Sequence, residues 1–229
     1  MCGRFYLDTP RERLREQFAL KQMPLLAARF NIAPSQDIAV IREGEAGREL
    51  VMLHWGLIPN WAKDEKTKFS MINARAETVA TKPAYRSAFR QRRCLVLASG
   101  FFEWKPTGRG RQPYAVRLKD TDLFAFAGLW ERWEGEDGKT IDSCTIIVTD
   151  ANELLRPIHD RMPVILAPAD YDDWLDSKTA EPDRLLTLLR TYPGKQMTLY
   201  PVSQRANSPK NDDPECIEQK PRDYEQHAQ

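Results

Sequence analysis

The stretch that decides the fold is Cys94-Leu-Val-Leu-Ala-Ser-Gly-Phe-Phe-Glu-Trp-Lys105. Its two apolar runs, Cys94–Ala98 and Phe101–Lys105, have the length and composition of β-strands. Comparable runs follow it along the chain, at Tyr114–Leu118, Leu123–Arg132, Cys144–Val148, Val164–Leu166 and Met197–Val202. Mostly antiparallel strands with a few peripheral helices predict an α+β fold.

Towards the N-terminus the pattern is again mainly β. Cys2–Leu7 predicts a strand, and Ile38–Arg42 and Leu50–Trp55 predict a hairpin. Thr9-Pro10-Arg11-Glu12 predicts a helix start with a capping box and proline at the first helical position. Arg29–Pro34 is expected to be a loop, since the residue before a proline avoids the helical region.

Short helices are expected at Pro83–Gln91, Pro168–Leu175 and Pro182–Thr191, and a long polar loop at Gly56–Ser70. No repeat, low-complexity segment or domain boundary is visible. We therefore expect one compact domain over residues 1–229, with Cys2 as the mature N-terminus and a C-terminal tail from about residue 205.

Composition narrows the class of protein. The chain is 41% hydrophobic and 29% charged, as in an ordinary globular protein, and no apolar run approaches the ~18 residues of a membrane span. The four cysteines are scattered and the three histidines lie far apart, which argues against a disulfide framework, a zinc site or any other metal. We expect a cytoplasmic monomer without a membrane partner or a cofactor.

Charge is unevenly distributed along the chain. From Lys82 to Lys119 the only acidic residue is Glu103, among many lysines and arginines, whereas Asp170 to Asp183 is predominantly acidic. The basic segment fits either a surface that binds a polyanion or an ordinary solvated surface.

Cys2 stands next to the initiator methionine, which is normally removed before a small residue. Removal would leave an α-amine and a thiol on adjacent carbons, with unperturbed pKa values of about 7.7–8.0 and about 8.5. The thiolate could then attack a carbonyl with the amine as base, or the amine could condense with an aldehyde and the thiol close a thiazolidine ring. Alternatively, Cys2 is a small buried residue that opens a strand.

Two titratable residues are candidates for proton transfer. Glu103 lies among Phe101, Phe102 and Trp104, and burial there would raise its pKa towards the range of a proton shuttle. His159, flanked by Asp160, could act as a general acid or base. A structural ion pair and a hydrogen-bonded core histidine are the corresponding alternatives.

The remaining candidates suit contacts to sugar or phosphate. Asn73 and Arg75 would point the same way on an extended segment, although Arg75 could also pair locally with Glu77. Arg4 could hold an anion beside the thiol. Two loop residues could stack against bases or equally pack against the protein; they are Pro34 and Trp61.

Together these stretches resemble the SOS response-associated peptidase (SRAP) family, essentially along the whole chain. The segments that carry the resemblance are Met-Cys-Gly-Arg-Phe at the N-terminus, Arg29–Pro34 (RFNIAP), Ile72–Thr78 (INARAET), Gly100–Lys105 (GFFEWK), Ile158–Pro163 (IHDRMP) and Asn211–Glu218 (NDDPECIE).

The resemblance implies a basic groove for single-stranded DNA and covalent attachment to abasic sites as a thiazolidine. It implies that Cys2 is the nucleophile, Asn73 binds the opened sugar, Glu103 shuttles protons and His159 promotes ring opening. It further implies that Arg4 and Arg75 hold phosphates. The loop around Trp61 departs most from the family pattern. Abasic single-stranded DNA would be the partner, with replication proteins as further partners.

The chemistry is consistent with this resemblance. An abasic site equilibrates with a ring-opened aldehyde, which a 1,2-aminothiol captures well. An imine alone would permit β-elimination of the 3′ phosphate, a lyase reaction, whereas ring closure by the thiol leaves the strand intact. Peptidase activity would be limited to removal of the residue before Cys2.

Two other functions remain open from the sequence. Class II glutamine amidotransferases, which are N-terminal-nucleophile amidohydrolases, also begin Met-Cys-Gly, but they usually continue with an aliphatic residue where this chain has Arg4. A non-catalytic single-strand-binding module would explain the basic segment but would leave Cys2 and His159 without a role.

Overall fold

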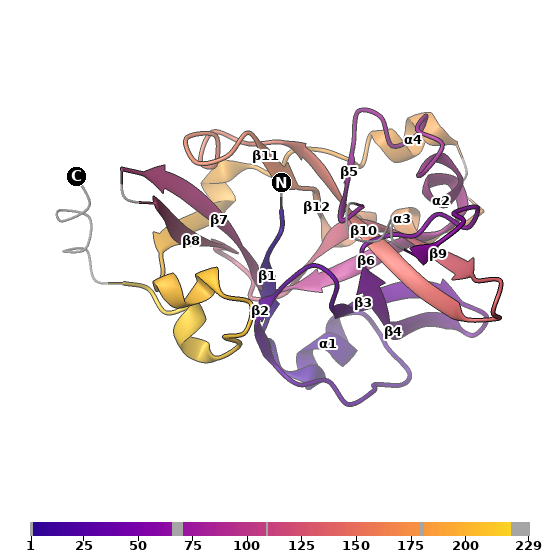
Figure 1. Ribbon diagram of the computed structural model, residues 1–229, viewed down its shortest axis with the longest axis horizontal. Helices are drawn as coiled ribbons and strands as arrows, with labels where there is room; N and C mark the ends of the chain where they lie inside the picture. The colour runs from indigo at the N-terminus through magenta and orange to yellow at the C-terminus, as the bar shows by residue number, and fades with distance from the viewer. Residues whose placement is uncertain (1, 66–70, 109, 179–180, 221–229) are drawn as a thin grey trace.

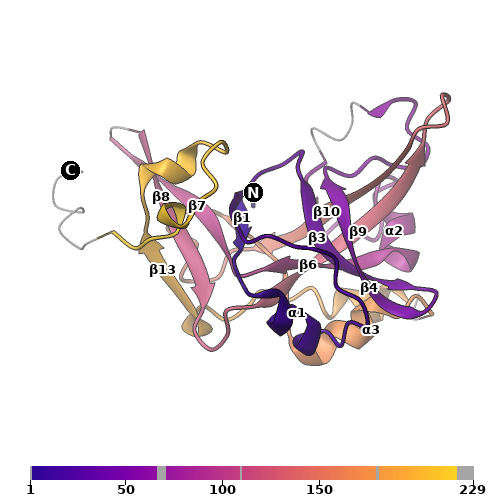
Figure 2. The ribbon, with the colours of Figure 1, turned by 90° about the horizontal axis from the view of Figure 1, so that it is seen from below.

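Two β-sheets that meet at strand β1 (Phe5–Leu7) make up most of the computed structural model, which describes residues 2–65, 71–108, 110–178 and 181–220 (Figures 1 and 2). The first sheet has the order β13-β8-β7-β1-β2, and every neighbouring pair is antiparallel. Its other strands are β2 (Arg29–Ile32), β7 (Gly100–Thr107), β8 (Gly110–Leu118) and β13 (Met197–Pro201).

The second sheet closes on itself. Strand β10 pairs in parallel with β4 and antiparallel with β9, so that β4, β3, β6, β9 and β10 form a ring of mixed direction. The ring strands are β3 (Asp37–Gly44), β4 (Gly47–Trp55), β6 (Arg93–Ala98), β9 (Phe124–Glu134) and β10 (Thr140–Asp150). Three short strands extend this sheet, namely β5 (Asn73–Arg75), β11 (Arg161–Pro163) and β12 (Ile165–Leu166).

The interior of the ring explains why these residues are strands. Burial is continuous along β6, from Arg93 to Ala98, because its apolar side chains are covered on both faces. One core cluster runs from Phe5 and Phe101 through Phe126 and Trp55, with edge-on contacts between the rings. The aromatic core therefore joins the two sheets at β1 and β7.

Helices are few and short. They are α1 (Arg11–Gln17), α2 (Arg86–Gln91), α3 (Tyr171–Leu175) and α4 (Pro182–Leu186), with 3₁₀ turns at Pro168–Asp170, Gly194–Gln196, Gln204–Asn207 and Pro214–Cys216. None of the helices in the described ranges is both long and apolar enough to cross a membrane. The molecule is accordingly a mostly β single domain, with less helix than the predicted α+β class.

Two local predictions are wrong. The Thr9 side chain does not cap α1; its hydroxyl bonds Ser99 Oγ and the Asp122 carbonyl at 2.7 Å each, tying the helix start to the sheet. The predicted loop at Arg29–Pro34 begins with β2, because an edge position beside β1 satisfies its backbone before the chain turns at Pro34. The predicted hairpin is confirmed as β3 and β4, whose pairing runs from Asp37↔His54 to Gly44↔Gly47.

Candidate functional site

Cys2 and Glu103 are brought together by the pairing of β1 with β7. Phe5 lies opposite Phe101, and the Phe102 N–H donates to the Arg4 carbonyl at 3.0 Å, so the chain before β1 runs beside Glu103. Both residues are buried, Cys2 at 0% and Glu103 at 3% exposure. Burial, together with the nearby Glu103 carboxylate, raises the pKa of the Cys2 thiol, which is therefore neutral.

Glu103 is held in a state suited to proton transfer. Burial raises the pKa of its carboxyl to about 8, and the negative charge of Asp160 contributes to the rise. Its Oε1 atom is buried and has no hydrogen-bond partner among the described residues. A buried carboxyl with a free oxygen and a pKa near neutrality can both give and accept a proton.

Asn73 provides a second unpartnered oxygen. Strand β5 runs parallel to β10, with Asn73 beside Ile146, and within the described part of the chain the Asn73 amide donates only a long 3.5 Å bond to the Ile146 carbonyl. Its Oδ1 is buried and lacks a partner in the described part of the chain. Because a buried polar atom without a partner is costly, this oxygen is available to a ligand donor.

Arg75 emerges on the same face of β5 and is exposed, as the alternation predicted. The Glu77 carboxylate makes its ion pair with Arg161, and Arg75 acts on it only through its nearby positive charge. No ion pair involves Arg75 within the described residues, which leaves its guanidinium available to solvent or to an anion.

His159 lies at the other flank of β10, just before β11. Its Nδ1 accepts the Arg161 backbone N–H at 3.0 Å and lies 3.0 Å from Asp160 Oδ1. The backbone donor requires an unprotonated Nδ1, and burial lowers the pKa of the ring, so we assign a neutral imidazole with its proton on Nε2. Asp160 would accept a hydrogen bond from Nδ1 if the ring became charged.

The loop candidates lie on the surface. Trp61 is 65% exposed, and the next residue, Ala62, accepts a 2.7 Å bond from Trp133 Nε1 that fixes the base of the loop. Pro34 is half-buried in the turn after β2. The last part of the predicted loop, residues 66–70, lies outside the described residues, as does Met1.

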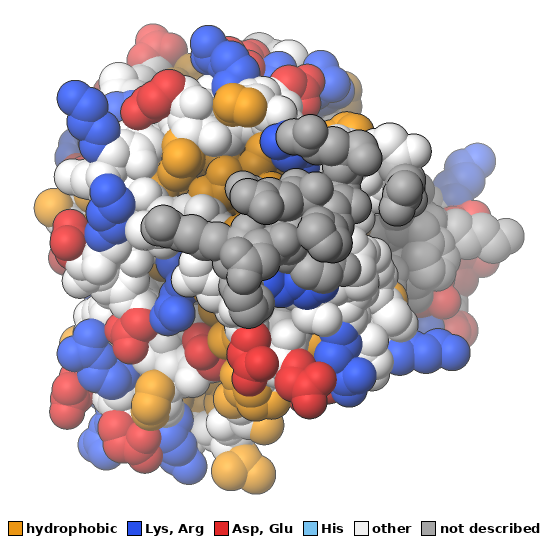
Figure 3. All heavy atoms as spheres, turned by 90° about the vertical axis from the view of Figure 1, so that its left-hand side faces the viewer, with side chains coloured by type: hydrophobic (Ala, Val, Ile, Leu, Met, Phe, Trp, Pro, Cys, Tyr) orange, Lys and Arg blue, Asp and Glu red, His pale blue; other side chains and the backbone are white. Residues whose placement is uncertain are grey.

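The basic segment does not form one surface. Arg93 is 3% exposed and donates to the carbonyls of Phe89 and Trp174, at the C-terminal ends of α2 and α3. Arg92 bonds Glu131 at 2.6 Å. Helix α2 and the β7–β8 hairpin lie at opposite ends of the molecule, and the side shown in Figure 3 mixes both signs of charge (Figures 1 and 3). Arg109 lies outside the described residues.

Arg4 is already engaged by the protein. Its Nη1 donates to Asn31 Oδ1 at 2.8 Å and to the Ala206 carbonyl at 3.0 Å, and its guanidinium lies over Trp104 at 5.6 Å from the ring centre. The predicted phosphate contact of Arg4 remains a prediction. Sequence reasoning missed Asn31, although it lies within the RFNIAP motif, and gave Asp160 no role of its own.

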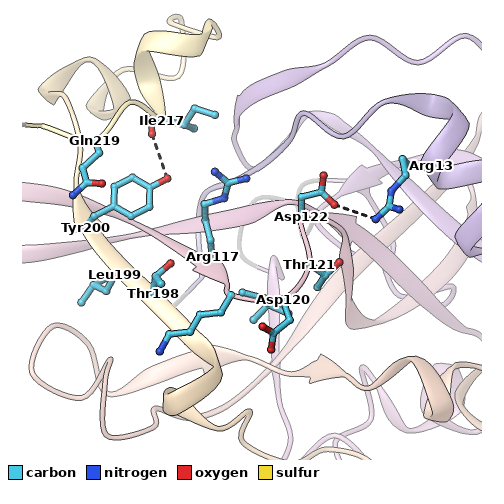
Figure 4. A pocket seen from close by; sticks show the side chains of 12 residues that line it. Arg13, Arg117, Asp120, Thr121, Asp122, Thr198, Leu199, Tyr200, Ile217 and Gln219 are labelled. Carbon is cyan, nitrogen blue, oxygen red and sulfur yellow. Dashed lines mark hydrogen bonds and ion pairs between the residues drawn. The ribbon is translucent and has the colours of Figure 1, made fainter.

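A pocket on the outer side of β8 and β13 contains none of the predicted site residues (Figure 4). Arg117 points into it beside Tyr200, whose hydroxyl donates to the Ile217 carbonyl at 3.3 Å, and Arg13 pairs with Asp122. Three basic side chains line it, those of Arg13, Arg117 and Lys119, together with the carboxylates of Asp120 and Asp122. Across the described ranges no three His, Cys, Asp or Glu side chains gather to hold a metal ion, and all four cysteines are unpaired.

Known proteins resemble this chain along nearly its whole length. The family model described as SOS response associated peptidase (SRAP) matches residues 1–209. The abasic site processing protein YoqW of Bacillus subtilis (strain 168) is 46% identical over 95% of this chain and 99% of its own length. The abasic site processing protein HMCES of Gallus gallus is 32% identical over 85% of this chain and 62% of its own.

The solved structures agree in fold. An X-ray structure of a protein from Bacteroides thetaiotaomicron superposes with a TM-score of 0.87 at 25% identity, covering 96% of this chain and all of that one. A protein from Bordetella bronchiseptica gives a TM-score of 0.76 at 27% identity, over 88% of this chain and all of the other. The two-sheet arrangement is thus shared with structures solved by experiment.

Proposed function

Because the chain belongs to the SOS response-associated peptidase family, we propose that it captures abasic sites in single-stranded DNA as a thiazolidine on Cys2. The observation that supports this most strongly is the buried pair of Cys2 and Glu103, an aminothiol precursor beside a carboxyl whose pKa is about 8. Similarity to proteins named for abasic site processing supplies the substrate class.

The first step is attack of the α-amine on the aldehyde carbon C1 of the ring-opened sugar. It requires removal of Met1, to which any peptidase chemistry would be confined, and a neutral amine. The resulting carbinolamine loses its hydroxyl as water when Glu103 gives it a proton, which leaves a protonated imine (iminium) and a Glu103 carboxylate. A carboxyl with an ordinary pKa would be ionised at pH 7 and could not act as this acid.

In ring closure the Glu103 carboxylate acts as a base and accepts a proton. The Cys2 thiol is neutral because burial raises its pKa, so it must lose a proton as sulfur bonds to the imine carbon. Glu103 accepts that proton and returns to its starting state. One water leaves and one thiazolidine forms, and loss of the imine prevents elimination of the 3′ phosphate.

Two further residues act on the sugar in this proposal. The neutral His159 donates an Nε2–H hydrogen bond to the ring oxygen and stabilises it as the sugar opens and closes, while the proton lost by the C1 hydroxyl reaches that oxygen through solvent. Asn73 Oδ1, which lacks a partner within the described ranges, would accept a hydrogen bond from a sugar hydroxyl. His159 lies just before β11 and Asn73 opens β5, and both of these strands pair with β10.

The DNA strand would lie across exposed residues around these groups. Arg75 would contact a phosphate next to the lesion, while Trp61 and Pro34 would pack against neighbouring bases. A lesion without a base costs little to unstack, and least of all in a single strand.

One experiment separates this function from the alternatives. The protein is incubated with glutamine, with an intact single strand and with the same strand carrying one abasic site, and the products are resolved under denaturing conditions. The proposal predicts a denaturation-stable adduct with the abasic strand only. Glutamine hydrolysis would support an amidohydrolase, and reversible binding without an adduct would support a binding module.

A further inference from the structure

A segment near the C-terminus is bound to the N-terminal strand. We call Ser203–Cys216 the clasp; it covers the face of β1 and β7 that carries Arg4, Tyr6, Phe102 and Trp104. Trp104 Nε1 donates to Asn207 Oδ1 at 2.7 Å, and Arg4 donates to the Ala206 carbonyl. Glu103 alternates with Phe102 and Trp104 along β7 and therefore faces the opposite side.

Asn31 in β2 is the centre of this contact. It is fully buried, and its Nδ2 donates to the carbonyls of Ser208 at 2.9 Å and Asn211 at 2.7 Å. Its Oδ1 accepts the bond from Arg4 at 2.8 Å. An amide side chain offers two N–H donors together with an acceptor oxygen, which neither an aspartate nor an apolar residue supplies.

Asp212 fastens the clasp to β2. Its carboxylate accepts the Phe30 N–H at 2.5 Å and the Asn31 N–H at 3.0 Å, and it bonds Arg29 Nε. Asp212 lies beyond residue 209, where the match to the family model ends. The adjacent Asp213 instead pairs with Arg205 inside the clasp, at 2.6 Å.

The clasp is linked to Cys2 through Arg4. Arg4 has its side chain held by Asn31 and Ala206 and its carbonyl held by the Phe102 N–H at 3.0 Å. Only Gly3 lies between Arg4 and Cys2 in the chain. Arg4 is therefore the contact of the clasp that lies nearest in sequence to the nucleophile. We infer that the clasp, through Asn31, Asp212 and Arg4, positions Cys2 against Glu103; this inference rests on the proposed function.

The role given to Arg4 differs from a phosphate contact. A phosphate ligand contributes to DNA affinity and to its salt dependence, with a slope of about −0.7 per contact on single strands. A positioning residue affects how often the bound aldehyde meets the amine in a reactive geometry, where a displacement of about 1 Å can cost on the order of a hundredfold in rate.

The test compares Asp212→Asn with Asp213→Asn as its matched control. Asp212→Asn should lower the crosslinking rate at saturating abasic strand by roughly ten- to a hundredfold and leave the half-saturating DNA concentration unchanged. Asp213→Asn should change neither quantity. Equal maximal rates in the two variants, or a loss confined to DNA affinity, would overturn the inference.

A second variant covers the case in which Asp212→Asn does not fold. Arg4→Gln removes the charge but keeps an amide donor for Ala206 and Asn31. It should lower the maximal rate while the salt slope for binding a non-reactive tetrahydrofuran strand stays that of wild type. A slope flattened by about 0.7 with an unchanged maximal rate would make Arg4 a phosphate ligand and contradict positioning.

Amide hydrogen exchange tests the role of the clasp without relying on the crosslinking reaction. The Phe102 N–H, which bonds Arg4, should exchange faster in Asp212→Asn than in Asp213→Asn without any DNA. If wild type forms no adduct, the proposed function fails while this measurement still tests the clasp. Equal exchange in both variants alongside normal crosslinking would refute the clasp and leave the proposed function standing.

Discussion

The two faces of β1 and β7 bury polar groups in contrasting ways. On the clasp face, the amide of Asn31 and the carboxylate of Asp212 are saturated with hydrogen bonds to backbone and arginine, although Arg4 Nε and the Tyr6 hydroxyl have no partner among the described residues. On the opposite face, Glu103 buries an oxygen without a partner among the described residues, and so does Asn73 in β5. A saturated network fixes a structure, whereas an unsatisfied buried group is costly unless a ligand completes it. The buried carboxyl and amide groups therefore differ between the part that holds the strand and the part that we propose reacts.

The largest loss of crosslinking is expected from substitutions at Cys2. If another residue were the nucleophile, the contrast between the two faces of β1 and β7 would not bear on the reaction. Cys2→Ala should abolish the stable adduct while reversible binding persists, and Cys2→Ser should form an imine and some strand cleavage but no thiazolidine. Denaturing gels with and without borohydride measure both. Cys94→Ala, a change at another buried cysteine, should leave the adduct intact.

The next largest effect is expected at Glu103. Glu103→Gln should lower the crosslinking rate at neutral pH by on the order of a hundredfold, because the side chain can no longer give and accept a proton. In wild type the rate should rise as the amine loses its proton and fall as Glu103 ionises above its pKa of about 8. The variant should lose the alkaline fall. Single-turnover rates across pH 6–10 (about the range that brackets both groups) measure this.

The matched control is Glu131→Gln, since Glu131 is also a buried carboxyl, with one oxygen that has no partner among the described residues, but lies on β9. It should keep both limbs of the pH profile. An alkaline limb that persists in Glu103→Gln would assign that titration to another group.

His159→Ala should have a smaller effect on formation, because the abasic sugar also opens slowly without help. By microscopic reversibility it should also slow release of DNA from a finished adduct. Chasing a preformed adduct with excess competing abasic strand measures the exchange, with His54→Ala as the control histidine. Exchange as fast as wild type in His159→Ala, but slow in Glu103→Gln, would require the two roles to be exchanged.

The smallest effect is expected at Arg75. Arg75→Ala should reduce the salt slope for single-strand binding by about 0.7, because one phosphate contact is lost. Arg184→Ala removes another exposed arginine, paired with Asp173 on α3, and should leave the slope unchanged. An unchanged slope in Arg75→Ala would place the DNA strand elsewhere.

Local chemistry explains what the sequence could predict. The alternation of Asn73 and Arg75, the apolar setting of Glu103 and the β3–β4 hairpin all follow from neighbours in the chain. The clasp could not be predicted this way, because Asn31 meets partners some 175–180 positions later. Arg93 likewise looked like surface charge, yet its partners are helix-end carbonyls that only the fold brings together.

The most direct test of the central claim is the intact mass of wild-type protein after mixing with a single-stranded oligonucleotide that carries one abasic site. The account predicts a species equal to the protein without Met1 plus the oligonucleotide minus one water, unchanged by borohydride. A species that gains two hydrogens on borohydride treatment, or no covalent species at all, would contradict thiazolidine capture by Cys2.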